Sequence, residues 1–366
     1  MIFSNFSSGN GSIYRFRALV LSALVASVGL ASCSDSTTSP GTTAVDMAPV
    51  LDDVSSNVIL ATYVELDNAA GLLEQAVATL RANPGEASLE SARQAWRNAR
   101  RPWEQSEGFL FGPVDTKGID PGIDSWPVNK VDLDAVLAGS ATLTKEYVDG
   151  LEGTLKGFHT IEYLLFGTDA RKPASSLTAR ELEYLTAVTG SFKGSTLQLR
   201  RSWEPTGENF VAQLKNAGGS GSTYVSQKDA VQELVNGMIS IADEVANGKI
   251  NDPYTQQDRS LEESQFSNNS LADFQDNIRS IRNIYLGTYG AFNGRGISTI
   301  VAARRADLDS RVRAEIDGAI AAIGAITPSF GEAIFTNRQA VEAAQSAVRT
   351  LQNTLESDVL PLVNAN

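Results

Sequence analysis

The spacing of apolar residues is the feature that most limits the fold of this chain. They recur at alternating steps of three and four, which is the repeat of one α-helical face. One clear run comprises Ile59, Tyr63, Leu66, Ala70, Leu73, Val77 and Leu80. Runs with the same spacing lie within 89–110, 231–245, 271–285 and 341–355. No segment alternates like a series of strands between turns, so the sequence predicts an all-α fold without a significant β-sheet.

A short glycine- and serine-rich stretch indicates how the helices are divided. Residues 217–222 read AGGSGS, the most linker-like run in the body of the chain. This run separates an N-terminal segment, 54–217, from a C-terminal segment, 223–366. Each segment is long enough for a helical bundle. We therefore expect two packed helical bundles.

The first residues have the composition of an export signal. Arg15 and Arg17 precede an uncharged apolar stretch at 18–30. A membrane-spanning helix needs roughly 20 apolar residues, so this stretch is too short for a permanent span. It is followed by a cysteine in the string Leu30-Ala31-Ser32-Cys33, which resembles a bacterial lipobox. The pattern predicts a lipoprotein signal peptide over 1–32.

We expect Cys33 to carry the lipid in the mature protein. Residues 33–53 begin with small polar side chains, proline and glycine, and are expected to form a flexible tether. The predicted location is the cell envelope, with the protein held by its lipid at the outer membrane, on the periplasmic side or at the surface. The alternative is an ordinary signal sequence that contains a free cysteine.

The composition excludes several classes of function. Asp and Glu number 43 against 30 Lys and Arg, a formal net charge of −13, which does not suit nucleic-acid binding. The chain has one Cys, so no intramolecular disulfide can form. It also has one His, which excludes sites with two or three imidazole ligands, such as those of the zincins.

That single histidine belongs to a possible metal-binding pair. On a helix, His159 and Glu162 are three residues apart and share a face. An imidazole and a carboxylate can bind one ion, but further ligands must be carboxylates, carbonyls or water. Such a set favours a hard ion such as iron, calcium or manganese over a structural zinc. The alternative is a hydrogen-bonded His–Glu pair within the core.

A second string runs from Arg100 to Pro113 and continues to Pro127. Pro102 lies within a helical pattern and should kink or end that helix. Beyond it, Asp115, Asp120 and Asp124 lie in a Gly- and Pro-containing loop without the spacing of an EF-hand. These aspartates are alternatively simple turn caps. Trp126 is interpreted either as a pocket wall or as packing.

Taken together, these strings resemble the imelysin family of bacterial envelope proteins. The resemblance rests on Gly-x-His-x-x-Glu at 157–162, Arg-Pro-aromatic-x-x-Ser-Glu at 101–107, Phe-Ser-x-Asn-Ser-Leu-x-Asp-Phe at 266–274, Asn-Ile-Tyr-Leu-Gly at 283–287 and Gly-Arg-Gly-Ile-Ser at 294–298. It covers about 54–362. The resemblance implies an all-α fold of two bundles, with the His motif at or near their interface. It also implies an envelope role tied to iron uptake, and some family members are called proteases.

The resemblance leads to a working hypothesis about the site. The protein is expected to bind iron, free or in a chelate, in a cleft between the bundles; another hard divalent cation is an alternative. The expected metal ligands are His159 and Glu162, with Glu107 and Asp124 completing or supporting the site. The expected ligand-binding residues are Arg101, which can meet a carboxylate or an anionic chelator, Ser106 and Trp126. Some relatives have Tyr where this chain has Trp103, so no phenolate ligand is available there.

Two other functions remain open. A metallopeptidase of the imelysin type is one, although His159-Thr160-Ile161-Glu162 lacks the His-Glu-x-x-His pattern and no Gly-x-Ser-x-Gly elbow is present. An adaptor lipoprotein without a metal is the other. The expected partners are the membrane, through the lipid on Cys33, iron or its chelate, and a TonB-dependent outer-membrane transporter.

Overall fold

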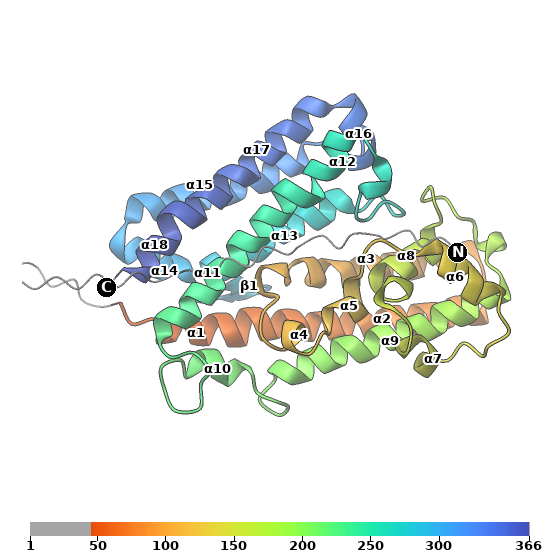
Figure 1. The fold of residues 1–366 in the computed structure, drawn as a ribbon, viewed down its shortest axis with the longest axis horizontal. Helices are drawn as coiled ribbons and strands as arrows, with labels where there is room; N and C mark the ends of the chain where they lie inside the picture. The colour runs from red at the N-terminus through yellow and green to blue at the C-terminus, as the bar shows by residue number, and fades with distance from the viewer. Residues whose placement is uncertain (1–44, 366) are drawn as a thin grey trace, which may run out of the picture. The chain divides into compact units, whose positions relative to one another are not determined.

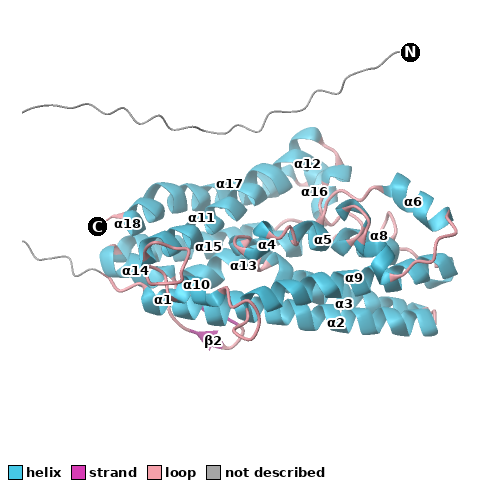
Figure 2. Ribbon diagram, turned by 60° about the horizontal axis from the view of Figure 1, so that its bottom comes forward, coloured by secondary structure: helices cyan, strands magenta, loops and turns pink. Residues whose placement is uncertain are grey.

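A computed structural model describes residues 45–365. The predicted signal peptide and the lipidated Cys33 lie outside the described residues. Helices make up most of the described chain (Figure 2), which confirms the all-α prediction. The strands of this part are two short segments, β1 (Thr288–Tyr289) and β2 (Phe292–Asn293), paired as an antiparallel hairpin.

The α-helices of the described residues are α1 (Ala48–Asp53), α2 (Leu60–Ala82), α3 (Glu86–Glu104), α4 (Pro113–Thr116), α5 (Asp120–Asp124), α6 (Lys130–Ala138), α7 (Lys145–Asp149), α8 (Gly157–Phe166), α9 (Ala179–Trp203), α10 (Val211–Lys215), α11 (Gln227–Asp243), α12 (Asn251–Gln256), α13 (Ser270–Leu286), α14 (Ile297–Arg304), α15 (Ala306–Gly324), α16 (Phe330–Thr336), α17 (Arg338–Thr354) and α18 (Leu360–Asn364). Three π-helical turns are η1 (Val54–Ile59), η5 (Glu244–Lys249) and η7 (Leu355–Val359). The 3₁₀ turns are η2 (Glu107–Phe109), η3 (Gly153–Leu155), η4 (Ala174–Ser176) and η6 (Arg259–Leu261).

Helical structure begins earlier than the sequence indicated. We expected a tether up to residue 53, whereas α1 already spans Ala48–Asp53. Pro49 is in the first turn of this helix, where its missing N–H is not required. Val50 and Leu51 are buried in the core. The proline and the small residues before it conceal this start in the sequence.

The long helices form two groups, which can be followed in Figure 1. Helices α2, α3 and α9 pack together, and α13, α15 and α17 pack in a row beside α11. The stretch 217–222 lies in the loop between α10 and α11. Residues 45–365 belong to one compact unit. The proposed boundary between two bundles stays a prediction.

The segment that follows α3 lies between the two groups. Turn η2 packs against α11 and α13. The backbone N–H of Gly108 donates to Ser280 Oγ at 2.7 Å. Gly237 of α11 lies so close that an added Cβ would be 2.2 Å from the Gly108 carbonyl oxygen. This close approach brings the end of α3 next to residues of the C-terminal half.

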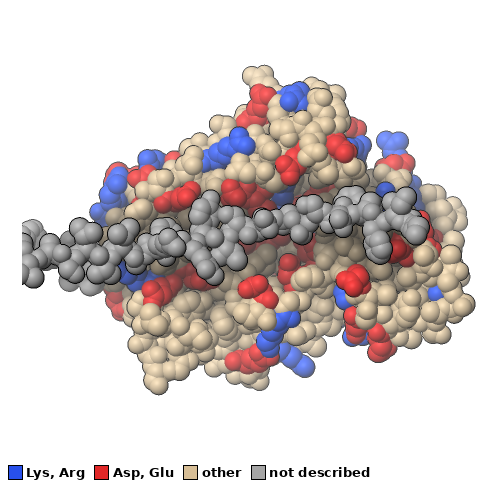
Figure 3. All heavy atoms as spheres, in the orientation of Figure 1, with Lys and Arg blue, Asp and Glu red and all other residues tan. Residues whose placement is uncertain are grey.

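Two further observations describe the surface and the helices. On the face drawn in Figure 3, acidic side chains are interspersed with Lys and Arg. Within residues 45–365, no helix combines the length and the apolar character that crossing a membrane requires.

Candidate metal centre

Helix α3 contributes a buried charged pair to the centre. Arg100 and Glu104 are one helical turn apart and fully buried, with Arg100 Nη2 2.5 Å from Glu104 Oε1. Arg100 also pairs with Asp124 and lies 2.9 Å from Glu263 Oε1. Its Nε lies 3.5 Å from Asp273 Oδ1. One guanidinium therefore faces four carboxylates from four parts of the chain.

The last residue of α5 and the first turn of α8 form the second part of the centre. Asp124 Oδ1 lies 3.2 Å from His159 Nε2, and Asp124 Oδ2 accepts a hydrogen bond from Trp103 Nε1 at 2.5 Å. Gly157 opens α8 with φ +76°, and an added Cβ there would be 2.3 Å from the carbonyl oxygen of Ile123. A glycine is therefore needed for α8 to approach α5 closely enough to bring His159 to Asp124.

Glu162 lies on the other side of the imidazole from Asp124. Its Oε2 lies 3.1 Å from His159 Nδ1. Its Oε1 accepts hydrogen bonds from the Ser267 backbone N–H at 2.8 Å and from Ser267 Oγ at 2.7 Å. Both oxygens of Glu162 thus have partners within the protein. This arrangement suits a carboxylate that orients the imidazole, with Nδ1–H donating to Glu162 and Nε2 directed toward Asp124.

The third part comes from η5 and from the loop that precedes α13. Lys249 Nζ lies 2.6 Å from Glu107 Oε2 and 3.1 Å from Glu263 Oε1. Asn277 of α13 donates through Nδ2 to Glu104 Oε2 at 2.6 Å and to Glu107 Oε2 at 2.8 Å. The carboxylates are therefore held in place by cations and by an amide.

Burial and neighbouring charges separate the carboxylates into two classes. Burial raises the pKa of Glu104 well above its ordinary value, that of Glu107 to about 8 and that of Asp273 to about 7. Burial also acts to raise the pKa of Asp124, but the charges of Arg100 and His159 outweigh it and lower that pKa. Lys249 and Arg100 lower the pKa of Glu263 in the same way. At neutral pH some of these carboxyl groups carry a charge while others hold a proton.

At neutral pH the imidazole of His159 is protonated on both ring nitrogens and carries a positive charge. Burial lowers the pKa of this imidazole, but the charge of Asp124 and the hydrogen bond to Glu162 raise it to about 9. A cation that binds Nε2 must therefore displace a proton.

The donor atoms fit a metal ion in number and in type. One atom each from Asp124, His159 and Glu263 lie within 4.8 Å of one another, and so do one oxygen each from Glu104, Glu107, Asp124 and Glu263. The buried His159 Nε2 has no hydrogen bond of acceptable geometry, although Asp124 is near, and Glu263 Oε2 has none either. A set rich in carboxylates with one imidazole suits iron or manganese.

A cavity of about 570 Å³ opens beside these carboxylates. Its wall includes Trp126, whose ring centroid lies 4.9 Å from that of His159. Six acidic side chains line it: Glu107, Asp120, Asp124, Glu244, Asp252 and Glu263. Among the described residues that line this cavity, Lys249 has the single cationic side chain. The cavity therefore gives a cation a route to the centre.

The structure brings together only some of the residues that the sequence singled out. His159, Asp124 and Glu107 contribute atoms to the centre, and Trp126 lines the cavity. Arg101 instead extends outward and pairs with Glu65 at 2.6 Å, with 56% of its side chain exposed.

Glu162 and Ser106 also take other positions than expected. Glu162 supports His159, as described above, and does not face the carboxylates. Ser106 is buried, and its Oγ donates to the Trp103 carbonyl at 2.6 Å. Its hydroxyl therefore satisfies the backbone at the end of α3 and does not line the cavity.

Several residues of the centre were not predicted from the sequence. They are Arg100, Glu104, Lys249, Glu263, Asp273 and Asn277. Arg100 and Glu104 border the apolar stripe that contains Trp96 and Trp103, so the spacing in the sequence was sufficient to predict a buried Arg–Glu pair. Asp273 and Asn277 lie one turn apart on α13. No sequence pattern indicated that Lys249 belongs to the centre, because its position depends on the π-helical turn η5.

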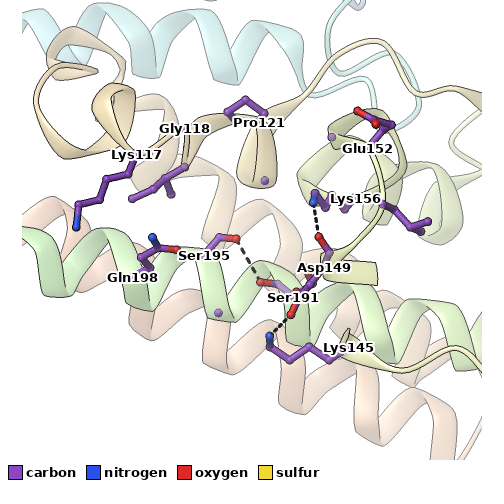
Figure 4. A pocket seen from close by; sticks show the side chains of 15 residues that line it. Lys117, Gly118, Pro121, Lys145, Asp149, Glu152, Lys156, Ser191, Ser195 and Gln198 are labelled. Atoms are coloured by element: carbon purple, nitrogen blue, oxygen red, sulfur yellow. Dashed lines mark hydrogen bonds and ion pairs between the residues drawn. The ribbon is translucent and has the colours of Figure 1, made fainter. Parts of the chain in front are cut away.

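A second cavity, drawn in Figure 4, has a different character. Its volume is about 480 Å³, and Lys117, Lys145 and Lys156 line it. Each lysine already has an oxygen partner: Lys145 Nζ lies 2.5 Å from Asp149 Oδ2, Lys156 Nζ donates to the Asp149 carbonyl at 3.0 Å, and Lys117 pairs with Glu208. The lining thus holds three lysines against two carboxylates, Asp149 and Glu152, which makes this cavity less favourable for a cation than the carboxylate-rich one.

Comparison with known proteins connects this chain to a family. The model of the imelysin family, named Peptidase_M75, matches residues 59–357. The chain is 32% identical over 315 residues to iron-regulated protein A of Synechococcus elongatus, which covers 84% of each protein.

Solved structures show the same fold. The crystal structure of a protein described as an iron-regulated protein A precursor, from Parabacteroides distasonis, is similar with a TM-score of 0.77 and 29% identity, over 86% of this chain and 94% of that one. An imelysin-like protein from Psychrobacter arcticum has a TM-score of 0.71 at 12% identity, over 87% and 96% of the two chains. The sequence and structural matches agree, and the chain belongs to the imelysin family.

Proposed function

We propose that this protein binds iron as a hydrated ion in the buried centre and takes part in iron uptake at the cell envelope. The ligands would be His159 Nε2 and oxygens of Asp124 and Glu263, with Glu104 and Glu107 as further carboxylates. Glu162 would hold the imidazole in position. When bound, the metal is cargo to be handed on, so the residues need to hold and release it without performing a reaction.

One observation carries this proposal. His159 Nε2 is buried without a hydrogen-bond partner of acceptable geometry and is directed at carboxylates, while Nδ1 is held by Glu162. An imidazole in a folded core normally satisfies both nitrogens. A nitrogen that faces a carboxylate at 3.2 Å without good hydrogen-bond geometry, with the opposite nitrogen fixed by another carboxylate, supports a metal-binding role for this histidine.

The charge of the cavity favours a free ion over an anionic chelate. Six carboxyl side chains and one lysine line the wall. A hydrated cation is attracted by this lining, whereas a citrate-like or catecholate chelate carries negative charge and is repelled by it. The choice of iron over other hard ions draws on the name of the Synechococcus relative, which describes regulation by iron.

The place of action is also part of the proposal. The lipobox-like string ending at Cys33 supports a lipid anchor in the envelope. An anchored iron-binding protein there would exchange its ion with a membrane transporter, for which a TonB-dependent outer-membrane transporter is our expectation. Labelling of cells with radioactive palmitate tests the anchor: the protein should be labelled, and its Cys33→Ser variant should not.

Calorimetric titration tests the metal site. Anaerobic Fe²⁺ and then Mn²⁺ would be titrated into the protein, into Asp124→Asn and His159→Ala, and into Asp149→Asn. The last variant is a matched control, because it removes the same charge at the other cavity. We expect about one ion per protein, binding at least tenfold weaker in the Asp124 and His159 variants, and unchanged binding in the control. Absence of binding, or equal binding in all variants, would refute the proposal.

The peptidase name of the family adds one further arm to this experiment. The same samples would be incubated with unfolded casein in the presence of the ion. We expect casein to remain intact, because the centre orients its histidine for binding and the chain contains no second imidazole for a zincin site. Ion-dependent cleavage that disappears in His159→Ala would replace the binding role with a peptidase role.

A further inference from the structure

Lys249 holds a position among the carboxylates that a bound cation would also need. Its Nζ lies 2.6 Å from Glu107 Oε2, 3.1 Å from Glu263 Oε1 and 3.7 Å from Glu104 Oε2. These three residues belong to the four-carboxylate group whose oxygens lie within 4.8 Å of one another. The ammonium group is thus a positive charge in the middle of a candidate metal site.

An ammonium and a multivalent ion compete for these carboxylates. Two positive charges at such short range repel each other. An ion that enters among Glu107, Glu263 and Glu104 therefore favours a position of the lysine further away. Such a movement requires a second acidic partner within reach of the Lys249 ammonium group.

The surroundings of Lys249 provide such a route. Its side chain lines the cavity of about 570 Å³, which also has Glu244 and Asp252 on its wall. Glu244 Oε1 lies 3.6 Å from Nζ, and 56% of the Glu244 side chain is exposed. A small rotation of the flexible lysine stem therefore moves the ammonium from the buried carboxylates to an acidic group at the solvent-facing edge.

The arginine of the centre lacks this freedom. Arg100 has no exposed side-chain surface and is enclosed by Asp124, Glu104, Glu263 and Asp273. It lies one turn before the end of the packed α3, whereas Lys249 ends the π-helical turn η5 and follows Gly248. Arg100 is accordingly a fixed counter-charge, and Lys249 is a movable one.

We infer that Lys249 is a built-in counter-cation that closes the empty centre and is displaced by the incoming ion. This inference rests on the proposed metal-binding function and adds a residue that sets affinity and selectivity. The tethered ammonium keeps the buried carboxylates compensated in the absence of metal. A monovalent ion gains too little from the carboxylates to replace it, whereas a divalent or trivalent ion gains enough.

The first test compares affinities. Mn²⁺, which avoids redox changes, would be titrated calorimetrically at one pH and one salt concentration into the protein, Lys249→Met and Lys145→Met. Methionine keeps much of the stem and removes the charge, and Lys145 is a matched control with its own carboxylate partner. We expect Lys249→Met to bind Mn²⁺ at least tenfold more tightly than the unaltered protein, and Lys145→Met to bind like the unaltered protein.

The outcomes separate the two claims. Equal or weaker binding by Lys249→Met, with binding intact in the unaltered protein, overturns the role of Lys249 and leaves the metal site standing. Absence of binding in both refutes the metal site and the role of Lys249 together. Binding by Lys249→Met alone shows that the lysine blocks the site and is not displaced, which overturns displacement and refutes ion binding by the unaltered protein.

A second measurement needs no variant. The unaltered protein would be treated briefly with acetic anhydride, with and without Mn²⁺ at constant pH, and the acetylation of each lysine read by mass spectrometry. Lys249 is only 8% exposed in its side chain and should label slowly in the metal-free protein. We expect Mn²⁺ to increase its labelling several-fold and to leave Lys145 unchanged. Unchanged or reduced labelling of Lys249 would overturn the inference.

Discussion

Replacing Gly157 by alanine tests how the centre is assembled. Gly157 has φ +76°, and an added Cβ would be 2.3 Å from the carbonyl oxygen of Ile123. That is 0.7 Å closer than the 3.0 Å below which Cβ contacts essentially never occur. Helix α8 must therefore move away from α5, and the 3.2 Å separation of His159 and Asp124 must grow.

The loss of stability expected for Gly157→Ala has two parts, which a control variant can separate. Alanine in the left-handed region costs about 1 to 2 kcal/mol. Forcing a methyl group into a closed contact adds about 1 to 3 kcal/mol. Gly118 has a similar φ of +58° with nothing within 4 Å of an added Cβ, so Gly118→Ala carries the first cost alone. We expect losses of about 1 to 2 kcal/mol for Gly118→Ala and about 2 to 5 kcal/mol for Gly157→Ala.

Urea unfolding at constant m-value measures both losses, and calorimetry adds the affinity for Mn²⁺. Gly157→Ala should lower that affinity at least tenfold, while Gly118→Ala should leave it unchanged. If the two variants lose the same stability and bind Mn²⁺ alike, the close approach of α8 and α5 does not build the site.

Two further predictions concern stability without metal. Arg100→Met should cost about 3 to 5 kcal/mol, because it leaves buried carboxylates without their partner. Arg101→Met should cost less than about 1 kcal/mol, because that arginine forms an exposed pair; equal costs in urea unfolding would contradict the assignment. Burial raises the pKa of Glu262 to about 7. A carboxyl whose pKa is raised on folding stabilises the protein at low pH, and this stability is lost as the pH rises through about 7. The shift from 4.5 corresponds to about 3 kcal/mol, so the contribution of Glu262 to the free energy of unfolding should fall by that amount between pH 4 and 8, and Glu262→Gln should make the total decline smaller by about as much. A variant with the same pH profile as the unaltered protein would show that another group is responsible.

The fold was readable from the sequence because each long helix has its own apolar stripe. The stripe from Ile59 to Leu80 lies almost entirely within α2, and Trp96 and Trp103 lie on the buried face of α3. The start of the fold was harder to read, because Pro49 conceals the first helix, α1. Periodicity reports which face of a helix is buried, but not where short irregular turns begin.

The site was readable only in part, because it joins residues far apart in the chain. His159 was conspicuous as the single histidine. Lys249 and Glu263 were not, since their approach depends on the π-helical turn η5 and on the loop before α13. The choice of Arg101 over Arg100 shows the same limit: adjacent helical positions differ by about 100°, so one residue faces the core and the next faces solvent.

The most direct test of the account is the position of a bound ion. Crystals of the protein would be soaked in Mn²⁺, and the anomalous signal of manganese would locate the ion. We predict a peak within coordination distance of His159 Nε2 and of oxygens from Asp124 and Glu263, at about 2.0 to 2.3 Å, with the Lys249 ammonium moved toward Glu244. A fully bound ion elsewhere, with Lys249 still between Glu107 and Glu263, would contradict the account.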